Sequence, residues 1–328
     1  MFRIKTLTVG VAVSAALGFG ANAVAAISAG AVAQSYLDVK HFQIRRANVL
    51  GAGISNQSIL PTVTVLSANS TAQVNPFLDG VSNPGTVIAP LGGNINLFKS
   101  VGAGYNPTAL LTGGGLPASS YAGGTSTSVG NALVTSDDVV VNSSVELKFP
   151  SVIGSSQSKQ TLDSRFSFNT VAPFVFELSF DSTGFMRTAL GPNLLLAKAA
   201  RTWNATVNRL RTVAGITFNE TVLSWSPDGV AGNVACTNNG ANVCSEVQDG
   251  FSLNTNNPTA LPTEDFNSGV QFGLFQFELG LAKGTYTFDI THTTTADALI
   301  VAVPEPTSIA LIGLGMLGIG AASRRRKA

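Results

Sequence analysis

Apolar and polar residues alternate along the second half of the chain. One side of the extended segment 173–181 carries only large apolar residues: Phe174, Phe176, Leu178 and Phe180. The residues between them are mostly polar and fall on the other side. The segment 284–292, GTYTFDITH, follows the same period of two. This alternation is typical of half-buried strands in an antiparallel sheet.

Three more segments of this half are predicted strands. Residues 216–225 and 270–281 alternate less strictly. Residues 200–213 fit a helical spacing as well as an alternating one, and their threonine, asparagine and valine content favours a strand. The short break 282–284, Ala-Lys-Gly, separates two strongly patterned segments and therefore predicts a hairpin.

The first half of the chain is patterned more weakly. Residues 35–44, 61–66 and 138–149 are predicted strands. Residues 102–130 contain eight glycines together with serine, threonine, alanine and proline. That composition is typical of a long mobile loop or linker.

The strand pattern predicts an all-β antiparallel β-sandwich, either as one sandwich or as two packed β subdomains. The predicted domain organisation has a β-rich region at residues 27–150, which contains the glycine-rich loop 102–130, and an antiparallel β-sandwich region at residues 151–303. The serine-rich stretch around residues 150–160 is the other plausible boundary. A sandwich is favoured over a closed barrel because the chain ends in an apolar segment and a basic tail.

The composition of the chain limits the classes of function that it can have. The 328 residues are 45% hydrophobic and only 11% charged, against about 25% charged in an average soluble domain. Of the 19 basic residues, six lie in the two terminal segments and 13 in the rest of the chain, where 17 of the 18 acidic residues also lie, a net charge of −4. An acidic body argues against nucleic acid as a partner, because phosphate contacts need clustered lysine and arginine.

The N-terminus has the layout of a secretory signal peptide over residues 1–26. Arg3 and Lys5 precede an apolar run over residues 7–20, and small residues follow. Cleavage sites fit after any of four alanines: Ala23, Ala25, Ala26 and Ala33. The alternative is a permanent membrane anchor, for which 14 apolar residues are short. A signal peptide implies the Sec translocon and signal peptidase as partners.

The C-terminus has a second apolar segment. Residues 307–323 carry no charge, and a helix of that length covers ~25 Å, slightly less than a hydrocarbon core of ~30 Å. Four consecutive cations follow: Arg324, Arg325, Arg326 and Lys327. Such a cluster stays on the cytoplasmic side of a membrane, so the region between the two terminal segments would be exported. A buried helix of a globular core would not explain these cations.

This tail resembles the PEP-CTERM sorting signal of Gram-negative, exopolysaccharide-producing bacteria. The matching parts are Pro304-Glu305-Pro306, the glycine-rich apolar span and the basic terminus, all within residues 304–328. The resemblance implies that an exosortase, a membrane enzyme, processes the chain near the motif. The transmembrane sorting helix would then anchor the precursor in the inner membrane only transiently, and the mature form would reach the cell surface or the exterior. The resemblance also implies that the catalytic residues for this processing belong to the exosortase and not to this chain.

The two cysteines, Cys236 and Cys244, flank an asparagine-rich loop. In an exported chain, two cysteines this close predict a disulfide across the loop. A metal site would need further ligands, and no histidine is near them in the sequence.

The sequence shows no catalytic constellation. His41 and His292 are the only histidines, and no Gly-x-Ser-x-Gly segment is present. We expect both histidines to be packed side chains within strands. Two histidines and loop-tied cysteines do not make a zinc site, and the loop around Glu264, Asp265 and Asn267 lacks a calcium-loop pattern. We therefore expect no catalytic residues, no metal and no cofactor.

Two functions follow from these observations. The first is a non-catalytic exported surface or extracellular-matrix protein, associated with exopolysaccharide or biofilm. The second is a carbohydrate-binding module or polysaccharide-acting enzyme exported by the same route. In that second case an aromatic side chain would stack on sugar, and five are available: Trp203, Trp225, Tyr36, Tyr105 and Tyr121. The alternative for the two tryptophans is a place in the core.

Overall fold

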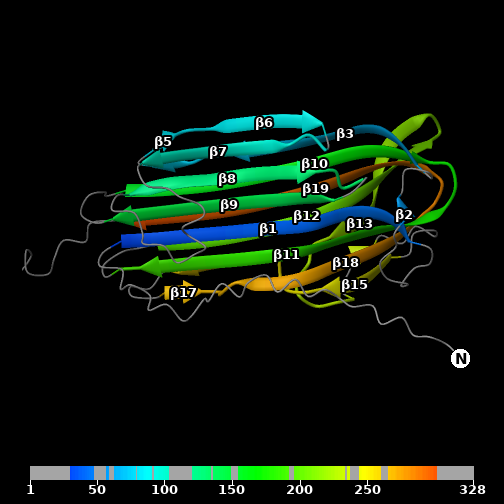
Figure 1. Ribbon diagram of the computed structural model, residues 1–328. Coiled ribbons are helices and arrows are strands. Elements are labelled where there is room, and N and C mark those ends of the chain that lie inside the picture. The colour runs from blue at the N-terminus through cyan, green and yellow to red at the C-terminus, as the bar shows by residue number, and fades with distance from the viewer. Residues whose placement is uncertain are drawn as a thin grey trace, which may run out of the picture.

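The alternating segments form two antiparallel sheets that pack face to face (Figure 1). The computed structural model describes residues 30–47, 57–58, 63–78, 80–90, 92–102, 120–133, 136–148, 154–191, 196–232, 235–236, 244–259 and 265–300. All regular structure in these ranges is strand, which confirms the all-β prediction.

The first sheet has the strand order β15-β18-β11-β1-β9-β8-β7, with β17 paired to β11 and β2 paired to β1. Its strands are β1 (Gly30–Ala47), β2 (Gln57–Ser58), β7 (Ile95–Gly102), β8 (Tyr121–Gly130), β9 (Asp137–Lys148), β11 (Phe174–Leu190), β15 (Cys244–Asp249), β17 (Asp265–Asn267) and β18 (Gln271–Leu281).

The second sheet has the order β14-β13-β12-β19-β10-β3-β6, with β16 paired to β12 and the short β4 and β5 attached to β10. Its strands are β3 (Val63–Val74), β4 (Phe77–Leu78), β5 (Val81–Ser82), β6 (Gly85–Pro90), β10 (Gly154–Thr170), β12 (Leu196–Val213), β13 (Ile216–Trp225), β14 (Ala235–Cys236), β16 (Thr255–Thr259) and β19 (Gly284–Ile300).

The two halves of the chain are interleaved in both sheets. β1 lies between β9 from its own half and β11 from the other half, and β3 pairs with β10. The regions 27–150 and 151–303 therefore share one sandwich, rather than forming a subdomain each.

The interior changes in character along the length of the sandwich. One end is filled by large side chains, including a group in which Phe180 lies 4.9 Å from Trp203 and 4.8 Å from Phe275, measured between ring centroids. The other end holds a separate cluster rich in alanine, with Ala31, Ala296 and Ile300 among its members. Small side chains let the two sheets approach each other more closely at that end.

Serine hydroxyls cross the gap between the sheets near this end. Ser143 of β9 donates to the carbonyl oxygen of Thr294 in β19 at 2.9 Å. Ser158 of β10 donates to the carbonyl oxygen of Gly123 in β8 at 2.7 Å. The interior is partly polar here, and these hydroxyls find partners in the facing sheet.

The prediction of a mobile loop over residues 102–130 is wrong for its last third. Residues 121–130 form β8, which lies between β7 and β9, and residues 103–119 lie outside the described ranges. Glycine serves close packing here: a Cβ added to Gly124 would lie 1.6 Å from Nε2 of Gln160 and 2.3 Å from the carbonyl oxygen of Asn142.

A larger side chain at residue 124 should therefore destabilise the protein. We expect Gly124→Val to lower the free energy of unfolding by about 3 kcal/mol, because the backbone of β9 cannot move aside. Gly284→Ala is the matched control, since its Cβ would meet no backbone atom and would approach only the side chains of Arg209 and Tyr286, at 3.1 Å or more. Urea unfolding measures both, and equal midpoints for the two variants would contradict the close sheet packing.

The predicted hairpin at residues 282–284 is instead a crossover between the two sheets. β18 belongs to the first sheet and β19 to the second. Two side-chain hydroxyls satisfy a carbonyl group of this connection: those of Thr170 and Tyr286 donate to the carbonyl oxygen of Ala282 at 3.1 and 2.8 Å. A true hairpin joins β12 and β13, where Ala214 and Gly215 have φ of 52° and 82°, as two-residue hairpins of this twist require.

The ambiguous segment 200–213 is a strand, as predicted. It forms most of β12, with Trp203, Ala205 and Val207 buried and the residues between them more exposed. The predicted strand at 216–225 coincides with β13.

Candidate functional site

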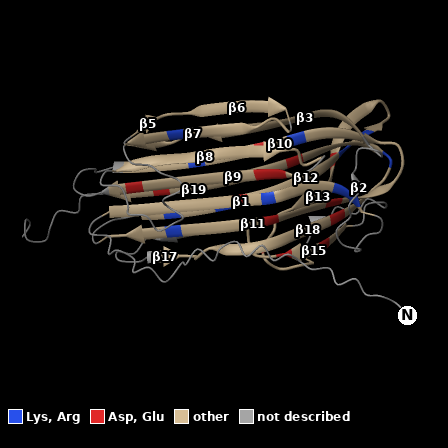
Figure 2. Cartoon of the chain, in the orientation of Figure 1, with Lys and Arg blue, Asp and Glu red and all other residues tan. Residues whose placement is uncertain are grey.

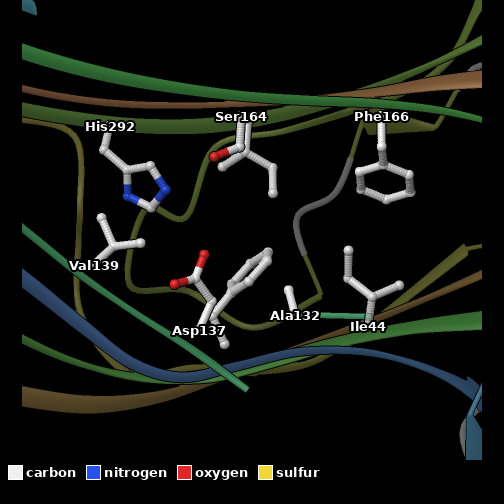
Figure 3. Close-up of a pocket in the computed structure, with 9 residues that line it drawn as sticks. Ile44, Ala132, Asp137, Val139, Ser164, Phe166 and His292 are labelled. Carbon is white, nitrogen blue, oxygen red and sulfur yellow. The ribbon is translucent and has the colours of Figure 1, made fainter. Parts of the chain in front are cut away.

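A small cavity between the sheets contains one histidine, one acid and one serine (Figure 3). His292 of β19 and Ser164 of β10 come from the second sheet, and Asp137 of β9 comes from the first. The remaining lining residues are Phe42, Ile44, Ala132, Val139, Phe166 and Ile290. Its volume of about 10 Å³ is at the lower limit for one water molecule.

These three side chains do not form a catalytic relay. The hydroxyl of Ser164 shares a hydrogen bond of 2.9 Å with that of Ser70. The carboxylate of Asp137 accepts from Ser128 at 2.9 and 3.1 Å. Nδ1 of His292 is buried and has no hydrogen-bond partner among the described residues. One water in the cavity would satisfy that nitrogen.

Burial shifts the pKa of two of these groups. His292 is 2% exposed, and burial lowers the pKa of its imidazole to about 3. Burial raises the pKa of the Asp137 carboxyl, against the hydrogen bond from Ser128. His292 is therefore a neutral packed side chain, as expected, and it lies edge-on to Trp203 with centroids 5.9 Å apart.

His41 differs from its prediction, because it is exposed rather than packed. It sits at a bulge in β1, between Lys40 and Gln43, with φ of 52°. Its Nδ1 lies 2.8 Å from Oδ1 of Asp181, and its backbone N–H donates to Asp138 at 2.9 Å. The side chain is 68% exposed, so the bulge turns it out of the sheet.

The two tryptophans are core residues, which corrects their assignment as sugar-stacking side chains. Trp203 is 0% and Trp225 is 1% exposed. Their rings meet edge to face at 5.1 Å, and Nε1 of Trp225 donates to Glu246 at 2.6 Å. Neither face can stack on a sugar in this structure.

The tyrosines provide no exposed sugar platform in the described ranges either. Tyr121 is 0% exposed, and its hydroxyl bonds to that of Ser144 at 3.0 Å. Tyr36 is half-buried and donates to Asp38 at 3.2 Å. Tyr105 lies outside the described residues.

Arg201 is a buried residue that no pattern in the sequence indicates. It is 1% exposed. Its Nη2 donates to the carbonyl oxygen of Ser252 at 2.9 Å and to the side chain of Gln271. The guanidinium lies 5.0 Å above the ring of Phe251. Burial lowers its pKa to about 10, and the close approach to Gly184 explains why that position is glycine.

The cysteines lie at the edges of different sheets. Cys236 ends β14 and is opposite Leu223 in the second sheet, and Cys244 begins β15 and is opposite Leu279 in the first. The side chain of Cys236 is outside the described part, so the disulfide stays a prediction. If formed, it joins the two sheets along one edge, next to the hydrogen bond between Trp225 and Glu246.

Removing this bond should loosen that edge. We expect Cys244→Ser to lower the free energy of unfolding by about 2–3 kcal/mol, since a closed loop restricts the unfolded chain. Reduction of the wild-type protein should have the same effect, and reduction of the variant none. Two free thiols in the secreted protein would contradict the prediction.

A second hollow lies on the outer face of the second sheet. Its polar walls come from three neighbouring strands: Asn69 and Thr71 of β3, Asp163 and Arg165 of β10, and Asp289 and Thr291 of β19. Its volume is about 370 Å³, and the backbone of β10 and β19 forms its floor. We call this hollow the sheet groove.

Hydrogen bonds hold the side chains of the sheet groove in place. Thr291 donates to Asp163 at 2.7 Å. Arg165 is 66% exposed on its side chain, and its Nε pairs with Asp289. This pairing raises the pKa of Arg165 further. The groove could not be predicted from the sequence, because the pattern of residues 154–170 does not predict the strand β10.

Comparison with known families decides the nature of the C-terminus. Residues 302–327 match the PEP-CTERM protein-sorting motif. The chain ends in a PEP-CTERM sorting signal. A comparison with curated proteins finds no match. The motif residues Pro304, Glu305 and Pro306 and the basic cluster 324–327 lie outside the described ranges.

The sorting motif implies an exported protein that an exosortase processes and that its C-terminus anchors transiently at the membrane. Among the described residues there is no apolar helix of bilayer-spanning length. Those residues also contain no group of three or more histidine, cysteine, aspartate or glutamate side chains able to hold a metal ion. Glu264 of the loop considered above is not among them.

The start of the first strand, β1, and the end of the last strand, β19, lie in the same cluster of buried residues. The alanine-rich cluster contains Ala31, near the start of β1, and Ile300, the last residue of β19. The predicted signal peptide and the sorting segment therefore connect to residues at the same end of the sandwich. Signal cleavage after Ala33 would remove the first four residues of β1, and three of them, Ala31, Val32 and Ala33, are each 0% exposed, so the structure favours the cleavage sites before residue 27.

Charged side chains are sparse over the sandwich. Figure 2 shows basic and acidic residues interspersed on the visible strands, without a basic stripe in the described part of the chain. This distribution agrees with the acidic balance of the body.

Proposed function

We propose that the protein is a non-catalytic component of the bacterial surface or extracellular matrix, where it associates with exopolysaccharide or biofilm. The observation that carries the proposal is the sorting motif at residues 302–327, directly after the last core strand, β19. The exosortase is the processing partner. The sandwich is the part that remains outside the cell.

The position of the titratable groups supports a non-catalytic role. The two side chains whose pKa values burial lowers to about 3 and about 10, His292 and Arg201, lie between the sheets. The cavity beside His292 has room for about one water molecule. Substrates of any size are kept away from these groups.

A carbohydrate-binding module exported by the same route is the second candidate. The sheet groove favours it, because its open, polar walls fit a hydroxyl-rich ligand better than an apolar one. The experiment must also distinguish a polysaccharide-acting enzyme from the matrix protein and the carbohydrate-binding module.

Cell fractionation combined with an activity assay tests the proposal. We expect the mature protein in the matrix fraction, and we expect purified protein to leave the number of reducing ends in isolated matrix polysaccharide unchanged. New reducing ends would favour the enzyme. Protein that remains in the cytosol would contradict export and with it the whole proposal.

A further inference from the structure

The outer face of the second sheet is polar along its two central strands. The outward-facing positions of β10 from 155 to 169, and those of β19 from 285 to 297, are all polar or charged. Hydrogen bonds link them across the strands, as between Thr161 and Thr293 at 3.3 Å and between Ser167 and Thr287 at 3.5 Å. Hydroxyl, amide and carboxylate groups therefore form an ordered surface rather than a set of free side chains.

The sheet groove is the hollowed part of this surface. Its volume of about 370 Å³ falls within the range of about 300–1,000 Å³ of ligand sites in proteins. Thr71, Asp163 and Thr291 form one row of cross-strand neighbours, and Asn69, Arg165 and Asp289 form the next. Because these side chains already hold one another, a ligand orders few further rotamers when it binds.

We propose that the sheet groove binds a neutral polysaccharide chain, an inference that rests on the matrix-associated function above. Sugar hydroxyls both donate and accept hydrogen bonds. The carboxylates of Asp163 and Asp289 accept from them, and the exposed guanidinium of Arg165 donates to hydroxyl and ring oxygens. Asn69 offers both kinds of group.

Charge selects against acidic polymers. The groove walls carry two carboxylates and one guanidinium, and the body has 13 basic and 17 acidic residues outside the terminal segments. A chain of uronic acids would meet net negative charge in the groove and around it. A neutral chain avoids this repulsion.

The groove favours a polymer over a single sugar. None of its lining residues is aromatic, so binding depends on hydrogen bonds to solvent-accessible groups, each of which contributes modestly. A long chain adds contacts along the polar rows on either side of the groove. These linked contacts raise the apparent affinity of the polymer.

Affinity electrophoresis of the mature secreted protein tests this proposal. The gels contain a neutral glucan, a neutral galactomannan or polygalacturonate, and a gel without polymer is the reference. We expect at least one neutral polymer to retard the protein and polygalacturonate to leave its mobility unchanged. Arg165→Ala and Asp163→Asn should each weaken the retardation about tenfold in apparent Kd, the loss that ~1.4 kcal/mol produces.

Lys40→Ala is the matched control, because it removes an exposed cation that pairs with Asp38 on β1 of the first sheet, away from the polar face of the second sheet. It should bind as the wild type does. Thermal unfolding of each variant verifies the fold, which the exposed position of Arg165 should preserve.

Three results would overturn the proposal. These are mobility unaffected by both neutral polymers, retardation by polygalacturonate, and unchanged binding by both groove variants. None of these results bears on whether the protein is sorted and processed. That is measured separately, by the mass of the released protein. Protein that reaches the matrix without retardation would leave the proposed function standing and remove the groove from it.

Discussion

We expect protein with Glu305→Ala to accumulate in the inner membrane as an uncleaved precursor. Glu305 is the one charged residue between Ile300 and the basic terminus, and it lies between two prolines, Pro304 and Pro306. Each proline lacks a backbone donor and restrains the residue before it to extended geometry. The motif therefore presents a single carboxylate that a membrane enzyme can read.

The measurement is fractionation of cells followed by intact mass of the protein in each fraction. We expect most of the variant in the membrane, with its C-terminal arginines retained, and the wild type outside the cell without them. Glu220→Ala is the matched control, since Glu220 pairs with Arg211 in the β12–β13 hairpin, far along the sequence from the motif. Normal release of the Glu305 variant would show that the motif is not read.

We expect acid to destabilise the protein through His292. The folded state holds the imidazole neutral down to a pKa of about 3, whereas the unfolded chain takes up a proton near 6.5. Below about pH 6.5 the unfolded state therefore binds the extra proton, and stability falls as the pH falls toward 3. Between pH 7 and pH 4 this linkage amounts to about 3 kcal/mol of unfolding free energy.

Two comparisons isolate this contribution. His292→Gln cannot titrate, so it should remove this part of the loss, and urea unfolding at several pH values measures it. His41→Gln is the control, because His41 is exposed. Asp137 acts in the opposite direction: its raised pKa means that the folded state takes up a proton at higher pH than the unfolded chain, which offsets part of the loss. Identical pH dependence in wild type and His292→Gln would contradict the neutral buried imidazole.

The strands that could be predicted are those with one apolar and one polar face. β11 and β19 bury every second side chain over most of their length, and this leaves a period of two in the sequence. β13 coincides with its prediction even though the residues near its start are exposed, because β-branched and aromatic residues mark it.

β10 left no such pattern, although it is central to the second sheet. Its buried positions include Ser156, Ser158 and Gln160, so both faces read as polar. β8 was hidden for a similar reason, since Gly123 and Gly124 are buried against the facing sheet. Where two sheets approach closely, small and polar residues replace large apolar ones, and the sequence signal of a strand disappears.

The candidate sites also differ in how far they could be predicted from the sequence. The sorting motif is contiguous, so its residues could be identified together. The sheet groove and the cavity depend on pairing between distant strands: Asp163 and Thr291 are hydrogen-bonded across 128 positions of the chain. Nothing local in either segment indicates that partnership.

The intact mass of protein collected from outside the cell tests the central claim most directly. We predict a chain that starts after Ala23, Ala25 or Ala26 and ends near Pro304, without the apolar segment and the arginines after it. A mass two hydrogens lower than the reduced chain would in addition report the disulfide. External protein that still carries residues 307–328 would contradict the account.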